Sequence, residues 1–135
     1  MQDFKKLSVW QSARLLTRCV YGITARYPAS ETDGLTSQMR RAAVSICSNL
    51  AASCGRGSDA DAKRFLHAAM GSACELESHS ILSADLAMIT AQVHGRLVEE
   101  IAAVKKMLAG LIRQLAVKTQ RGNAAAESRE LTAES

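Results

Sequence analysis

Hydrophobic residues recur every three or four positions along most of the chain, a spacing that places them on one face of an α-helix. The pattern predicts four amphipathic helices, over residues 7–27, 34–54, 59–89 and 93–118. Short connections between such helices favour an antiparallel arrangement. We therefore predict an all-α fold, an up-down-up-down four-helix bundle over residues 1–119, followed by a disordered C-terminal tail over residues 120–135.

Each predicted helix has a stripe of residues that should face the core. The stripes comprise Val9, Ala13, Leu16, Val20, Ile23 and Tyr27; Leu35, Met39, Ala42, Ile46, Asn49, Leu50 and Ser53; Phe65, Leu66, Ala69, Ala73, Leu76, Ser80, Ser83 and Ala87; and Leu97, Ile101, Val104, Leu108, Leu111 and Leu115. Asn49 is the unusual member, because a buried amide must be hydrogen-bonded. We interpret it as a polar residue that specifies helix packing.

The helix over residues 34–54 has a second apolar stripe, opposite the first, through Val44, Cys47 and Ala51. A helix that is apolar on both sides normally packs on both sides. These three residues are therefore candidates for an interface between copies of the chain.

The sequence of residues 34–51 also resembles a family signature. Gly-Leu-Thr-Ser-Gln-x-Arg-Arg-Ala-Ala-Val-Ser-Ile-x-x-Asn-Leu-Ala is similar to that of bacterial four-helix-bundle proteins associated with intervening sequences of large-subunit (23S) ribosomal RNA. Further motifs agree in order over about residues 4 to 90: Phe4-Lys5-Lys6-Leu7, Val9-Trp10-Gln11, Tyr27-Pro28, Gly55-Arg56, Phe65-Leu66, Ala69 and Gly71-Ser72. The chain departs from the family at Ala52 and Ser53, where an acidic residue and a glycine are usual, and at Cys47, where proline is common.

The resemblance implies an assembly but no activity. The same broad fold is distantly similar to the accessory variability determinant of diversity-generating retroelements, a homopentamer that contacts a reverse transcriptase and nucleic acid. By this resemblance the chain is expected to form a homopentameric ring. The branch that it resembles more closely has no firmly assigned activity.

Composition adds the cellular context. The first residues lack the basic-then-apolar order of a signal peptide, and no apolar run is long enough to span a membrane, so we expect a cytoplasmic protein. Cys19, Cys47, Cys54 and Cys74 form no Cys-x-x-Cys pair and are interpreted as small hydrophobes, with disulfides the lesser alternative.

Residues that could support catalysis or bind a metal are scattered. Glu75 and His79 lie four apart, but one such pair is not a site, and the chain has no Glu-x-x-His motif of a di-metal bundle. No serine or cysteine has a histidine nearby in the sequence, and Gly55-Arg56-Gly57-Ser58 lacks the spacing and lysine of a phosphate-binding loop. We expect no enzyme, no metal, no cofactor and no small-molecule substrate.

Positive charge is concentrated at the start of the chain. Residues 1–58 contain eight Lys or Arg against three Asp or Glu, whereas the whole chain has a net charge of +4. The candidates for contact with nucleic acid are Lys5, Lys6, Arg14, Arg18, Arg40, Arg41 and Arg56, with Trp10 or Tyr21 available to stack an unpaired base.

Two functional hypotheses follow. One is a homo-oligomer that binds RNA or a ribonucleoprotein through the basic first hairpin. The alternative is a protein scaffold or adaptor that does not bind nucleic acid, in which these charges are only solvated.

Overall fold

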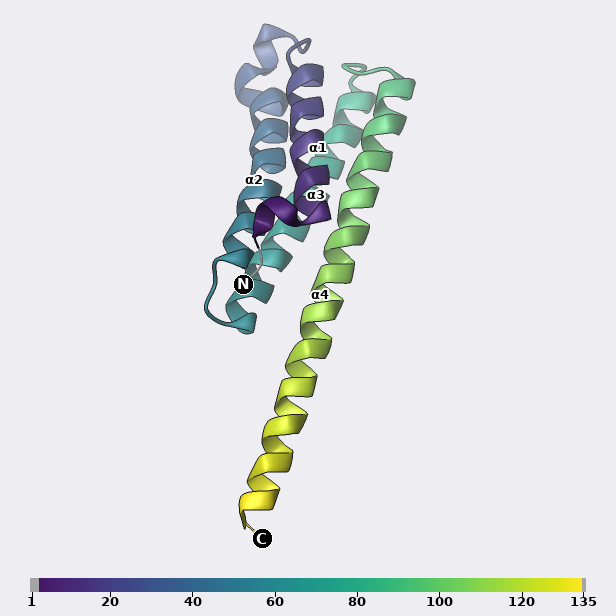
Figure 1. Ribbon diagram of the computed structural model, residues 1–135. Helices are drawn as coiled ribbons and strands as arrows, with labels where there is room; N and C mark the ends of the chain where they lie inside the picture. The colour runs from purple at the N-terminus through teal and green to yellow at the C-terminus, as the bar shows by residue number, and fades with distance from the viewer. Residues whose placement is uncertain (1–2, 135) are drawn as a thin grey trace.

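The computed structural model describes residues 3–134, and within that range it contains four α-helices and no β-strand (Figure 1). The helices are α1 (Ser8–Thr24), α2 (Ser37–Cys54), α3 (Asp59–Asp85) and α4 (Ala91–Glu134). Successive helices run in opposite directions, which confirms the predicted all-α four-helix bundle. Residues 1, 2 and 135, which the expected bundle and tail included, lie outside the described residues.

The core forms where the four apolar stripes meet. Its largest fully buried side chains include Leu16, Met39, Ile46, Leu50, Leu76, Leu97, Ile101 and Leu108. Burying one such side chain stabilises the folded state by about 1.5–3 kcal/mol. The four helices therefore pack with their apolar stripes facing one another. Leu111 and Leu115, at the end of the α4 stripe, are only half-buried, because α4 runs beyond the ends of its neighbours.

The connection between α1 and α2 is longer than predicted, so α1 ends earlier and α2 begins later than the sequence pattern indicates. The first helix ends in hydrogen bonds from Arg26 N and Tyr27 N to the carbonyl oxygens three residues earlier. Tyr27 is still buried, and its hydroxyl lies 3.4 Å from Met39 Sδ. A π-helical turn with non-helical backbone at Gly34 then precedes α2. The Glu31 carboxylate accepts a hydrogen bond from Leu35 N at 3.1 Å, which satisfies one amide of this turn.

Four further core predictions differ from the structure at the edges of the bundle. Ala87 is exposed and has a φ of 59°, because α3 ends at Asp85 and Ala87 lies in the left-handed turn that follows. Ile23 and Phe65 are half-buried at the flanks of their helices, and Leu35 is half-buried in the turn that precedes α2. The predicted serines Ser80 and Ser83 are fully buried.

Asn49 is half-buried and donates hydrogen bonds to Ser45 of its own helix, and Ser45 in turn contacts α3. Its Nδ2 donates to Ser45 O at 2.9 Å and to Ser45 Oγ at 3.0 Å. The Ser45 hydroxyl lies 2.8 Å from the Ser72 hydroxyl on α3. This chain of hydrogen bonds links α2 to α3 and fixes their relative position.

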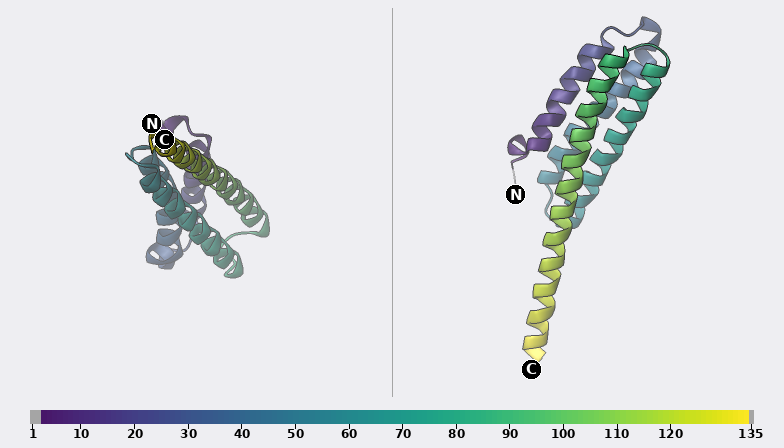
Figure 2. Two further views of the ribbon diagram at one scale, coloured as in Figure 1. Left: turned by 90° about the horizontal axis from the view of Figure 1, so that it is seen from below. Right: turned by 90° about the vertical axis from the view of Figure 1, so that its right-hand side faces the viewer.

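The C-terminal segment also differs from the expectation of a disordered tail. Helix α4 continues to Glu134 and projects away from the other three helices (Figure 2). Every side chain from Thr119 to Leu131 is exposed. The segment contains no proline, and its three consecutive alanines, Ala124 to Ala126, favour helix, so α4 continues through Gly122.

Two further features bear on the expected context. Cys19, Cys47, Cys54 and Cys74 all carry free thiols. Within residues 3–134, no helix combines the length and apolarity that crossing a membrane requires.

Candidate nucleic-acid interface

The first two helices carry positive charge without any negative charge. Helix α1 contains Arg14 and Arg18, helix α2 contains Arg40 and Arg41, and neither contains a carboxylate. Arginine residues without acidic neighbours leave their guanidinium groups available to phosphate or to an acidic partner. The structure separates these arginines into groups with different roles.

Arg40 is bound to α1 and has a structural role. Its Nε donates to Thr24 Oγ1 at 2.9 Å, and its Nη2 donates to Tyr21 O at 3.3 Å. Its guanidinium also lies 4.5 Å from the centroid of the Tyr21 ring. These contacts hold α1 against α2, and they place a positive charge on one face of an aromatic ring.

Arg14, Arg18 and Tyr21 lie on the outward side of α1, and we call these three residues the α1 basic face. Spacings of four and three residues put them on adjoining turns of one helix face. Both arginines are exposed, and Tyr21 is 43% exposed. Arg40 covers one side of the Tyr21 ring, and Tyr21 still keeps this exposed fraction.

Trp10 is less available than Tyr21. It is half-buried against the core, the Phe4 ring meets it edge-on at 5.0 Å, and the Arg14 guanidinium lies 5.8 Å from its centroid. Its ring is therefore in contact with Phe4 and Arg14 at the start of the α1 basic face.

The remaining basic candidates come from other segments of the chain, although Lys5 is joined to α1 by a hydrogen bond from Gln11 Nε2 to its carbonyl oxygen at 2.7 Å. Lys5 is 4.0 Å from Asp3, and Lys6 is exposed beside it. Arg56 donates from Nε to Ala52 O at 3.2 Å and lies 4.3 Å from the centroid of the Phe65 ring. Arg41 is exposed and has no ion pair with a described residue. The seven candidates therefore differ in their local contacts.

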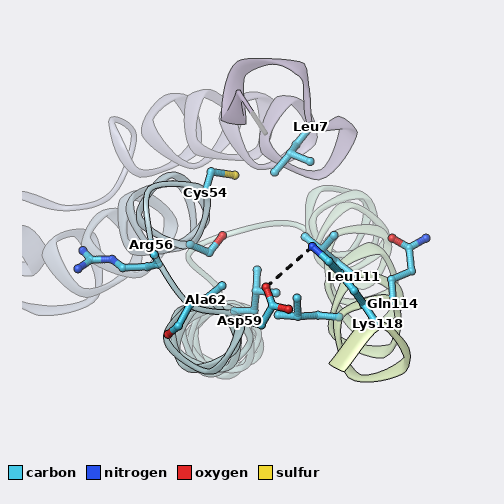
Figure 3. A pocket seen from close by; sticks show the side chains of 13 residues that line it. Leu7, Cys54, Arg56, Asp59, Ala62, Leu111, Gln114 and Lys118 are labelled. Atoms are coloured by element: carbon cyan, nitrogen blue, oxygen red, sulfur yellow. Dashed lines mark ion pairs between the residues drawn. The ribbon is translucent and has the colours of Figure 1, made fainter. Parts of the chain in front are cut away.

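A cavity of about 500 Å³ lies at the end of the bundle where α4 leaves it (Figure 3). Its apolar side chains include Leu7, Leu66, Leu111 and Leu115. Asp59 and Lys118 span part of the opening at 4.0 Å. The Arg56 side chain points away from the other labelled side chains, so it does not place a cation in the cavity.

Side chains of the metal-ligating types are dispersed. Within residues 3–134, no three His, Cys, Asp or Glu side chains come close enough to hold a metal ion. His79, four residues after Glu75, has a buried Nδ1 atom without a hydrogen-bond partner among the described residues. His94 Nδ1 lies 3.1 Å from the Ser80 hydroxyl on the adjacent helix, a contact between packed helices.

The proposed interface residues of α2 do not all face outward. Val44 is 41% exposed and Ala51 is half-buried. Cys47 faces α1, with its Sγ 3.5 Å from Thr17 Oγ1, and burial raises the pKa of its thiol. Val44 is thus the clearest outward apolar residue of this stripe, whereas Cys47 packs inside the protomer.

Comparisons with known proteins agree with this architecture. The family model described as 23S rRNA-intervening sequence protein matches residues 5–110. A crystal structure of a protein with unknown function from the S23 ribosomal protein family of Bacteroides thetaiotaomicron superposes with a TM-score of 0.73. It is 19% identical, and the match covers 78% of this chain and 95% of that chain, so this likeness shows the fold alone. No curated protein matches the chain.

Proposed function

Because the chain belongs to the 23S rRNA-intervening sequence protein family, we propose that it is a non-enzymatic homo-oligomer that binds RNA, or a ribonucleoprotein, through the α1 basic face. The observation that carries the proposal is the arrangement of α1. It presents Arg14, Arg18 and Tyr21, all three exposed, on one side, and the helix has no carboxylate. This combination suits an unpaired strand, whose phosphates and bases are both accessible.

Each group on this face has a defined role. Arg14 and Arg18 bind phosphate oxygens, since a guanidinium matches them in geometry and charge. Tyr21 stacks a base on the side that Arg40 leaves open. Seven residues of helix separate Arg14 from Tyr21, or about 10 Å, so one protomer contacts only a few nucleotides.

Assembly supplies the affinity that one such face lacks. We propose a ring, of five protomers by the family resemblance, in which the α1 basic face is repeated. A strand that contacts two or more faces then gains from effective concentration, and its avidity exceeds the single-site affinity by orders of magnitude. The free outward position of Val44 supports an interface on α2.

Fluorescence anisotropy with labelled RNA tests the proposal. Arg14→Glu combined with Arg18→Glu should weaken binding of a single-stranded RNA at least tenfold. The matched control is Lys106→Glu combined with Arg113→Glu, the same charge change at two exposed residues of α4, and it should leave most of the affinity. Equal loss in both double variants would show that only net charge matters.

Tyr21 separates stacking from charge. Tyr21→Leu should weaken binding of single-stranded RNA roughly fivefold or more, since stacking on an aromatic ring is worth about 1–3 kcal/mol per base, whereas Tyr21→Phe should bind like the wild type. Neither change should alter binding of a fully paired duplex. Equal effects on strand and duplex would overturn the stacking role.

One observation favours the second candidate, a protein scaffold. Large apolar side chains are exposed near the C-terminal end of α3 and directly after it: Ile81 and Leu82 are each 46% exposed, and Leu86 is 60% exposed. Such residues are typical of protein contacts rather than RNA contacts. If the wild type binds no RNA at low salt, the scaffold is the better account.

A further inference from the structure

Charged residues of opposite sign are segregated along the chain. Residues 4–30 and 34–58 contain no Asp or Glu, and residues 65–95 contain no Lys or Arg. The bundle therefore has a hairpin, α1 and α2, with only positive side chains, and a length of α3 with only negative ones. Surfaces with complementary charge on one molecule can bind each other between copies.

The first surface lies on α2 and carries one positive charge. We call Ser37, Arg41, Val44 and Ser48, which follow each other at spacings of three and four, the α2 outer face. Val44 is exposed at its centre, and Arg41 is its only charged residue. Arg41 has no ion pair with a described residue.

The second surface lies on α3 and has the opposite charge. We call Cys74, Glu75, Ser78, Ile81 and Leu82 the α3 outer face. Ile81 and Leu82 are each 46% exposed, and Glu75 is exposed without an ion pair to a described residue. Glu77 is excluded from this surface, because it pairs with Lys105 of α4 at 3.2 Å within the protomer.

We propose that the α2 outer face of one protomer docks on the α3 outer face of a second copy. Val44 packs against Ile81 and Leu82, and Arg41 approaches Glu75. The small residues Ser48, Cys74 and Ser78 let the two helices approach closely. This inference rests on the homo-oligomer of the proposed function, and it adds which two surfaces meet.

The occupant follows from the chemistry of both surfaces. The α3 outer face has no cation, so it does not attract RNA, whereas the second copy offers an arginine three residues from an apolar side chain. Because the two surfaces are different, the contact is head-to-tail, and its repetition gives a ring where the rotation between copies closes and a filament where it does not. A self-complementary dimer would use one surface twice. The α1 basic face is not part of the contact and stays exposed.

A mixing experiment distinguishes these arrangements. Val44→Asp blocks one surface and Leu82→Asp blocks the other, and both positions are exposed, so each variant should keep the helical circular dichroism of the wild type. Light scattering should show an oligomer for the wild type and a monomer for each variant. An equal mixture of the two variants should form dimers and nothing larger, since one intact contact remains between them. Val117→Asp, at a comparably exposed position on α4, is the control and should assemble like the wild type.

The outcomes separate this inference from the proposed function. A wild-type monomer at high micromolar concentration would overturn the assembly itself. A wild-type oligomer that survives Leu82→Asp, or a variant mixture that stays monomeric, would overturn the pairing of these surfaces while the assembly stands. Charge reversal provides a second test of the pairing. Arg41→Glu and Glu75→Arg should each raise the dissociation constant of the oligomer about tenfold, and the variant that combines both should recover most of the lost affinity.

Discussion

Replacing Arg40 by methionine tests the separation of the arginines into structural and functional groups. The substitution keeps a long side chain but removes the hydrogen bonds to Thr24 Oγ1 and Tyr21 O and the contact with the Tyr21 ring. Hydrogen bonds to a charged group are worth about 1.5–3 kcal/mol, and less where water reaches them, as at Tyr21 O. An exposed cation–π contact adds about 0.5–1 kcal/mol. We expect a total loss of about 2 kcal/mol in the free energy of unfolding.

Chemical denaturation at fixed protein concentration measures this loss. The control is Arg18→Met, which removes the same charge from an exposed side chain, and it should change the free energy of unfolding by less than about 0.5 kcal/mol. Thermal unfolding should show Arg40→Met about 6–10 °C below the wild type. A double-mutant cycle with Tyr21→Leu isolates the ring contact. Unfolding of the Arg40 and Arg18 variants at the same denaturant concentration would refute a structural role for Arg40.

Three further predictions concern stability. Burial raises the pKa of the Cys47 thiol above its ordinary value of 9.0, so its contribution to stability is present below about pH 9 and is lost above it; Cys47→Ala should reduce the fall in stability in denaturation curves taken from pH 7 to 10.5, and the part that remains is expected from Cys19 and Tyr27, whose pKa values burial also raises. Truncation after Gln120 should change the free energy of unfolding by less than about 0.5 kcal/mol, because side chains from Thr119 to Leu131 are exposed, and a decrease above about 2 kcal/mol would show that the projecting helix is packed in solution. His79→Leu should leave stability unchanged or raise it, since it removes a buried nitrogen without a partner, and elemental analysis of the wild type should find no stoichiometric iron or zinc; a destabilised variant or one metal per chain would contradict this interpretation.

The helices and most of the core follow from local spacing, whereas their ends depend on details that the pattern does not contain. Leu97, Ile101, Val104 and Leu108 are buried as predicted, because a seam of alternating threes and fours has only one apolar face. The prediction for Ala87 is wrong because the periodicity continues past the helix, and no glycine or proline marks its end.

The candidate site shows a different limit. The sequence identifies the basic hairpin but cannot distinguish Arg40 from Arg41, since their roles depend on which neighbour each side chain meets. Helix geometry places the two side chains about 100° apart, and only the position of α1 shows that Arg40 reaches Tyr21. For the same reason Cys47, outward on a helical wheel, packs against Thr17.

The salt dependence of RNA binding tests the central claim most directly. The claim is that Arg14 and Arg18 bind phosphates, and every phosphate that a variant no longer neutralises should reduce the slope of log affinity against log salt by about 0.7 for a single strand. The affinity of the wild type for RNA should therefore fall steeply as the salt concentration rises about fourfold, from 50 to 200 mM. The Arg14→Glu, Arg18→Glu variant should show a slope smaller by about 1.4 for each protomer engaged. Identical slopes for both proteins, with the oligomer intact, would contradict an RNA interface on α1.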